Sequence, residues 1–253
     1  MTRALEQLDA LAAESDGNTD LQLELVWAYQ NLGAMPDSKL SARREIYEKA
    51  VTLTEKILAA EPTNLKARDR LAMLYLNSIF VSRLRGDVEY TVEYNRRAVE
   101  IADDLYRKFP DVPEYRDSFW TANYHYALTL QQLGKASEAT ETARKILPAE
   151  AMQRSGGETD SYDFMKPHLT RLQIGYGLSY AGAYQTAIKE LETALAECQE
   201  QTVKRPNADI LRRNEAITRC SRRLWFTKRI CVYWGRRKSN GGTAPIFSAS
   251  RRV

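Results

Sequence analysis

The sequence is poor in the residues that usually carry metal and redox chemistry. It has two histidines, His125 and His168, which lie too far apart to form a two-histidine helix motif. Its three cysteines, Cys198, Cys220 and Cys231, have neither Cys-x-x-Cys nor zinc-finger spacing, so we interpret them as reduced structural thiols. The sequence therefore predicts no metal site, and we expect no cofactor.

Motifs of the common catalytic classes are also missing. There is no glycine-rich phosphate loop and no Gly-x-Ser-x-Gly elbow. The short Gly175-x-Gly177 motif does not follow a predicted strand, so we interpret it as a site of helix packing. The carboxylates are scattered at the spacing of a solvated helix surface. We therefore expect a protein that is not an enzyme.

No run of 18 or more apolar residues occurs, so the sequence predicts no transmembrane helix. The N-terminal segment is amphipathic and acidic early on, which does not fit a secretory signal. We expect a cytoplasmic protein, or a periplasmic one if the chain is a fragment of a membrane-anchored protein.

Acidic residues are scarce in one part of the chain only. Residues 204–253 contain 14 Lys and Arg against 2 Asp and Glu, whereas residues 1–203 contain 23 against 31. We predict a domain boundary near residue 205, followed at 206–253 by a partial terminal helix and a basic, aromatic, poorly ordered tail. The mixture of cations and aromatic rings would suit nucleic acid or an anionic membrane surface. Alternatively, the tail is a sticky terminus or sequence that was never selected to continue the preceding pattern.

Three kinds of landmark recur between residues 50 and 206 at one interval of 48 residues. Such a period indicates one supersecondary unit used repeatedly, each copy burying its apolar face against its neighbours. The landmarks are the glycines Gly86, Gly134 and Gly182, the prolines Pro62, Pro110 and Pro206 with Glu158 at the missing step, and the small residues Ala50, Ala98 and Ala194 with Ile146 as the larger member.

The unit is clearest between Gly175 and Leu195, which we interpret as a helix end, a tight turn at Gly182 and the start of a second helix. Small residues at Gly175, Ala187 and Ala194 would let the two helices approach closely. An apolar stripe at helical spacing comprises Leu178, Tyr184, Ile188, Leu191 and Leu195.

These offsets resemble those of the tetratricopeptide repeat. The resemblance implies an all-α fold, a right-handed α-solenoid of antiparallel helix pairs that serves as a protein-interaction scaffold. The period of 48 residues exceeds the usual 34, so each helix would be about seven residues longer, close to two turns. We therefore expect helices of roughly 20 residues. The expected ranges are 1–14, 19–33, 41–60, 64–85, 87–109, 113–133, 135–154, 160–181 and 184–204.

Details of the first two helices can also be predicted. In the first helix, Leu5, Leu8, Leu11 and Ala12 form an apolar side that either caps the array or indicates that the chain begins part-way through a longer protein. In the second, Thr19 or Asp20 can cap the N-terminus. Its inward side would comprise Leu21, Leu25, Ala28, Tyr29 and Leu32.

The resemblance also implies a binding face. In this family the first helix of each pair lines a concave surface, through positions ten, six and three residues before the turn glycine. The lining would be aromatic and apolar, suited to a protein or peptide partner with an amphipathic helix or an extended apolar segment. Alternatively, the lengthened helices bury these side chains against their own neighbours. The positions are Leu76, Phe80, Arg83, Tyr124, Leu128, Gln131, Leu172, Tyr176 and Ser179.

Two N-terminal segments carry a narrower resemblance. Residues 4–14, Ala-Leu-Glu-Gln-Leu-Asp-Ala-Leu-Ala-Ala-Glu, and residues 21–33, Leu-Gln-Leu-Glu-Leu-Val-Trp-Ala-Tyr-Gln-Asn-Leu-Gly, resemble the repeat arms that follow the catalytic domain in some bacterial serine/threonine protein kinases. The resemblance implies that the chain is the regulatory arm of a larger kinase. No kinase signature is present in this chain, so any such activity would belong to another part of the protein.

Overall fold

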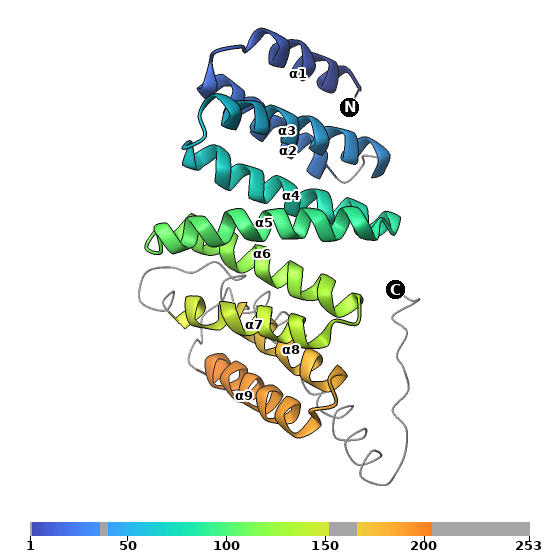
Figure 1. The fold of residues 1–253 in the computed structure, drawn as a ribbon, viewed down its shortest axis with the longest axis vertical. Helices are drawn as coiled ribbons and strands as arrows, with labels where there is room; N and C mark the ends of the chain where they lie inside the picture. The colour runs from blue at the N-terminus through green and yellow to red at the C-terminus, as the bar shows by residue number, and fades with distance from the viewer. Residues whose placement is uncertain (1, 36–39, 152–165, 204–253) are drawn as a thin grey trace. The chain divides into compact units, whose positions relative to one another are not determined.

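The computed structural model describes residues 2–35, 40–151 and 166–203, and across these ranges it contains nine α-helices and no strand (Figure 1). The all-α class is therefore confirmed. The expected tail at 206–253, with Cys220 and Cys231, lies outside the described residues. The helices are α1 (Thr2–Glu14), α2 (Thr19–Ala34), α3 (Leu40–Ala60), α4 (Leu65–Arg85), α5 (Val88–Lys108), α6 (Pro113–Gln132), α7 (Ala136–Ala151), α8 (Lys166–Tyr180) and α9 (Tyr184–Val203).

Five of the described helices have the expected length of roughly 20 residues. α3, α4 and α5 each contain 21 residues, and α6 and α9 each contain 20. At 1.5 Å per residue these helices are about 30 Å long. The expected gain of about two turns per helix is therefore confirmed for these five helices.

Short polar side chains begin several helices. The Asn18 Oδ1 accepts a hydrogen bond from the Leu21 amide at 3.0 Å, so Asn18 caps α2, and the prediction of Thr19 or Asp20 is wrong. Thr19 instead donates its hydroxyl to Glu61 at 2.6 Å. A cap must sit just before the first helical residue, and α2 already begins at Thr19.

The predicted turn glycines lie between the two helices of each pair. Gly86, Gly134 and Gly182 have φ values of +75°, +76° and +79°, a region that side chains with a Cβ rarely adopt. At the second turn the Lys135 amide donates to the Leu130 carbonyl at 2.9 Å, the backbone pattern of a Schellman cap. The prediction of a repeated tight turn is confirmed.

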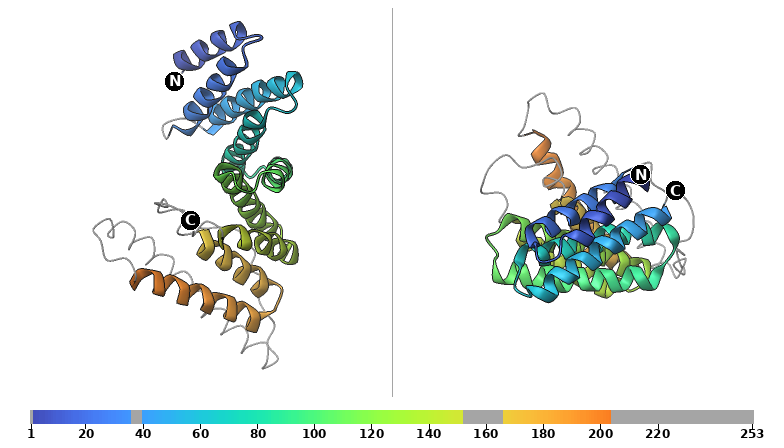
Figure 2. Two further views of the ribbon diagram at one scale, coloured as in Figure 1. Left: turned by 90° about the vertical axis from the view of Figure 1, so that its left-hand side faces the viewer. Right: turned by 90° about the horizontal axis from the view of Figure 1, so that it is seen from above.

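The chain divides into two compact units, Met1–Tyr126 and Ala127–Val253, and the boundary falls inside α6. In the first unit, consecutive helices pack from α1 to α5; in the second, α7 packs on α8 and α8 on α9. Figure 2 shows α8 and α9 side by side, joined by the turn at Gly182. Within each unit this is the solenoid-like packing of neighbour on neighbour that the repeat predicts.

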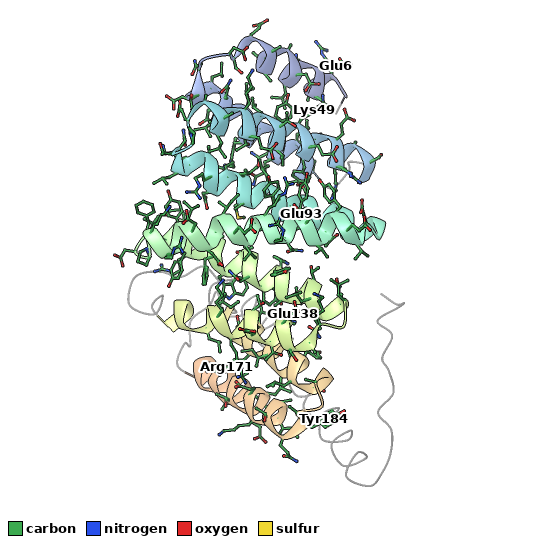
Figure 3. The ribbon with its side chains drawn as sticks, viewed as in Figure 1. Glu6, Lys49, Glu93, Glu138, Arg171 and Tyr184 are labelled. Atoms are coloured by element: carbon green, nitrogen blue, oxygen red, sulfur yellow. The ribbon has the colours of Figure 1, made fainter. Side chains whose placement is uncertain are left out.

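The small-residue series marks the core. Ala50, Ala98, Ile146 and Ala194 are all completely buried, which confirms the 48-residue register. A Cβ added to Gly175 would lie 2.7 Å from the Leu191 side chain, so α8 and α9 approach as closely as the small residues predict. An ion pair of 3.1 Å between Arg171 and Glu190 also joins these two helices; Arg171 is labelled in Figure 3.

α1 covers the first unit's core with Leu5, Leu8 and Ala12. Leu11, however, is 48% exposed, so its assignment to the apolar side is wrong; α1 contacts neighbours along a narrower stripe than the sequence suggests. Asp9 links α1 to α2 and α3. It accepts hydrogen bonds from the Tyr29 hydroxyl of α2 at 2.7 Å and from Lys49 of α3 at 2.6 Å; Lys49 is labelled in Figure 3.

A groove along the first helices of the pairs

Two of the nine predicted lining residues are not available for binding. Leu76 is 2% exposed and belongs to the first unit's core, and Leu172 is 7% exposed and packs with Leu191 of α9. The expectation that they line an open surface is wrong. The alternative holds for this pair, because the long helices bury these leucines against their own neighbours.

The other predicted positions are half-buried or lie outside the described side chains. Tyr124 stacks on Trp120 with ring centroids 4.8 Å apart, and Tyr176 packs beside the buried cluster of α9. Gln131 accepts a hydrogen bond from Gln173. Leu128 and Ser179 are also half-buried, whereas the side chains of Phe80 and Arg83 lie outside the described part. Positions 76–124 belong to the first unit and positions 128–179 to the second.

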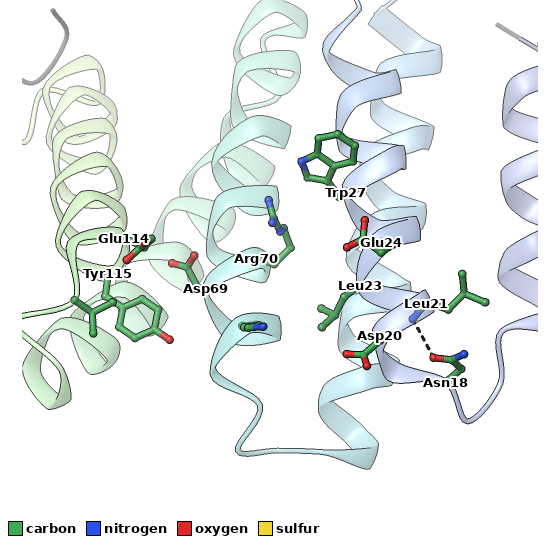
Figure 4. Close-up of a pocket in the computed structure, with 12 residues that line it drawn as sticks. Asn18, Asp20, Leu21, Leu23, Glu24, Trp27, Asp69, Arg70, Glu114 and Tyr115 are labelled. Atoms are coloured by element: carbon green, nitrogen blue, oxygen red, sulfur yellow. Dashed lines mark hydrogen bonds between the residues drawn. The ribbon is translucent and has the colours of Figure 1, made fainter. Parts of the chain in front are cut away.

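The first unit contains an open groove of about 960 Å³ across the N-terminal halves of α2, α4 and α6 (Figure 4). These are the first helices of their pairs, as the family resemblance implies for a binding face. The groove lies elsewhere along them, however: its residues on α4 precede the turn glycine by 16 to 20 positions. Its lining comprises Asn18, Asp20, Leu21, Leu23, Glu24, Trp27, Lys66, Asp69, Arg70, Val112, Glu114 and Tyr115.

The apolar part of the groove is centred on Trp27. This side chain is 52% exposed, and Figure 4 shows it pointing from α2 into the space that Arg70 enters from α4. Leu21 also lines the groove and is 38% exposed, so its predicted inward orientation is wrong. Leu25 and Tyr29, one turn apart, lie on the buried face of α2. Leu21 and Trp27 lie outside that face.

Charged groups make up much of the remaining lining, so the expectation of an aromatic and apolar surface does not describe this groove. Its four carboxylates outnumber its two cations, Lys66 and Arg70. Among the residues that the structure describes, none of these carboxylates forms an ion pair. The carboxylates are Asp20, Glu24, Asp69 and Glu114.

Two acids on α5, Asp104 and Glu93, form ion pairs with neighbouring cations. Asp104 pairs with Arg68, Arg107 and Lys108 at 2.6 to 2.9 Å. Glu93, labelled in Figure 3, pairs with two arginines of its own helix, and the hydrogen bonds from these arginines lower its pKa to about 2. Asp104 and Glu93 therefore have cationic partners within the chain, whereas the four groove carboxylates form no ion pair with a described residue.

The surroundings of Asp69 raise the pKa of its carboxyl above the ordinary value. Burial raises the pKa of its carboxyl, and the negative charges of Glu114 and Asp117 raise it further. The hydrogen bond from the Ser118 hydroxyl, 2.5 Å long, and the charge of Arg70 offset this only in part. The net result is a half-buried carboxylate whose ionised form is destabilised at this position.

Tyr115 lies in the same electrostatic cluster. Burial raises the pKa of its phenol, and the charges of Asp69 and Glu114 raise it further. Figure 4 shows these three side chains together where α4 and α6 face each other. The cluster offers two acceptor carboxylates beside an aromatic ring.

The arrangement suits binding through charge and an apolar anchor. No group of three or more metal-ligating side chains occurs in the described ranges. Over the same residues, no helix combines the length and the apolar character needed to cross a bilayer.

The groove differs from the predicted binding face because the family's offsets fall nearer the turn glycines. One signal was present: Trp27 is a large apolar residue that falls between the buried positions of α2. In comparisons with known proteins, no family model matches the chain and no curated protein sequence matches it. The tetratricopeptide and kinase-arm resemblances therefore stay predictions from the sequence.

Proposed function

We propose that this chain is a non-catalytic protein-interaction module that binds an extended peptide segment of a partner in the groove of α2, α4 and α6. The observation that carries the proposal is the exposed Trp27 in an open groove of about 960 Å³. Helical repeat proteins commonly bind partners on a surface formed by successive repeats. The N-terminal resemblance supports one context for this module, the regulatory arm of a larger bacterial serine/threonine kinase.

The form of the groove favours a peptide over a small molecule. Small-molecule sites usually enclose most of the ligand surface within one cleft. This groove is open and crosses three helices, so an extended chain could contact each of them in turn. Tryptophan is enriched among the residues that dominate binding energy in such interfaces.

The test starts from a random dodecapeptide library displayed on phage and selected against the immobilised full chain. Selected peptides are synthesised with a fluorescent label, and Kd is measured by anisotropy for the wild type, Trp27→Ala and Leu11→Ala. We expect Trp27→Ala to cost about 2 kcal/mol, roughly a 30-fold weaker Kd. The matched control Leu11→Ala removes a similarly exposed side chain outside the groove and should leave Kd unchanged.

Both substitutions should leave the thermal melt almost unchanged, because each side chain is about half exposed. If no selected peptide loses affinity on Trp27→Ala while the fold is intact, the groove is not the binding site and the proposal is refuted.

A further inference from the structure

We propose that the groove selects a partner segment carrying an arginine or lysine, whose cationic group binds between α4 and α6 against Asp69 and Glu114 and over the ring of Tyr115. The inference rests on the proposed function, since it names the chemistry of the peptide that the groove would bind. Three observations carry it: the position of Asp69, Glu114 and Tyr115 together in the groove, the absence of an ion pair to Asp69 or Glu114 from any described residue, and the partial burial of Asp69.

Acids alone would carry no such inference. Glu114 is the second residue of α6, where a negative charge stabilises the helix dipole without any ligand. Asp69 has no comparable explanation, because it is the fifth residue of α4 and lies half-buried. Its carboxylate accepts one hydrogen bond from Ser118 and faces the negative charges of Glu114 and Asp117. A site of this kind gains stability when a cation binds.

Among the described residues, neither of the two cations that line the groove fills this position. The Arg70 guanidinium donates a hydrogen bond to Gln30 of α2 at 3.3 Å, and Figure 4 shows its side chain on the α2 side of α4. Lys66 is exposed and forms no ion pair with any residue in the described ranges.

The proposed ligand group matches the cluster chemically. A guanidinium can donate parallel hydrogen bonds to a carboxylate and can stack on an aromatic ring, and Tyr115 supplies such a ring beside the two acids. A lysine would gain the charge interaction and a cation–π contact but not the paired hydrogen bonds. We therefore expect arginine to be preferred over lysine.

The test uses the library-selected peptides described above. Their sequences should share an arginine or lysine, and its replacement by glutamine should weaken binding to the wild type about tenfold or more. Against the double variant Asp69→Asn, Glu114→Gln, the arginine and glutamine peptides should bind equally. The matched control is Glu89→Gln: Glu89 is the exposed second residue of α5, as Glu114 is of α6, and lies outside the groove.

A second readout reports on the cluster itself. The ¹³C resonance of the Asp69 carboxyl should titrate at a lower pH when the arginine peptide is bound, since a nearby cation favours the ionised form. The glutamine peptide should not produce this shift.

The outcomes separate the two proposals. If selected peptides depend on Trp27 but not on their cationic residue, or if the double variant keeps the preference for arginine, the cation site is refuted and the peptide groove stands. If binding does not depend on Trp27, the proposed function itself fails. Circular dichroism of each variant shows that the fold is retained.

Discussion

Replacing Gly175 by alanine should destabilise the second unit, although alanine is the better helix former. In a helix interior, alanine is favoured over glycine by about 1 kcal/mol. The new Cβ, however, would lie 2.7 Å from both Cγ and Cδ2 of Leu191, whereas carbon atoms in good contact are about 3.5 to 4.0 Å apart. Leu191 is completely buried, so it cannot turn into solvent.

The magnitude follows from these two opposing effects. Overpacking a close contact costs about 1 to 3 kcal/mol, so about 2 kcal/mol of strain less about 1 kcal/mol of helix propensity leaves a net loss of about 1 kcal/mol. For a chain of this size, such a loss lowers Tm by about 2 to 4 °C.

A double-mutant cycle with Leu191→Ala isolates the contact. On its own, Leu191→Ala should cost about 2 to 5 kcal/mol, because it removes a fully buried leucine. In that background the Cβ at position 175 has no partner to strike, so Gly175→Ala should now stabilise by about 1 kcal/mol. The effect of Gly175→Ala on the free energy of unfolding thus changes sign between the two backgrounds, which corresponds to a coupling of about 2 kcal/mol between the two positions.

Urea titrations of the full chain, followed by far-ultraviolet circular dichroism, measure all four free energies of unfolding. If Gly175→Ala stabilises the protein equally in both backgrounds, α8 and α9 do not approach at this position. The 48-residue register that places a small residue there would then be wrong.

Three further predictions concern single residues. Asp69→Asn should raise stability at neutral pH, because the pKa of Asp69 is raised in the folded state and its ionisation therefore weakens the native state as pH increases. In pH-dependent melts, the higher Tm of the variant should vanish below the unfolded pKa of about 4. Asp9→Asn should lower stability at neutral pH by about 0.5 to 1 kcal/mol. Although burial raises the pKa of Asp9, the hydrogen bonds from Lys49 and Tyr29 lower it overall, so in pH-dependent melts this contribution should disappear as pH falls through the lowered folded pKa. Gly134→Ala should cost about 1 kcal/mol in urea titrations through backbone strain alone, because its φ is +76° and no atom lies within 4 Å of the added Cβ; a neutral result would contradict the left-handed turn.

The position of the groove could not be derived from residue spacing. Trp27 lies two positions from the buried Leu25, about 200° around the helix, so spacing places it off the buried face but does not say whether another helix covers it. Which face of α2 stays uncovered depends on where α1, α3 and α4 pack, and these contacts are set by the whole unit. The transferred offsets failed at Leu76 and Leu172 for the same reason, since the longer helices cover those positions.

What the sequence by itself determined is the repeating unit: the helices, the turns at Gly86, Gly134 and Gly182, and the small residues at close contacts. These are local properties, because a positive φ favours glycine and helical periodicity marks the face that must be buried. Only the tertiary structure decided which carboxylates meet cations of other helices and which gather in a groove. Asp104 and Asp69 look alike in the sequence, but ion pairs surround the first, whereas burial and like charges surround the second. Arg107 and Lys108 pair with Asp104 from its own helix, at a spacing that the sequence shows. Arg68 beside Asp104 and the acids of α6 beside Asp69 come from other helices, so their charges act there only when the helices pack.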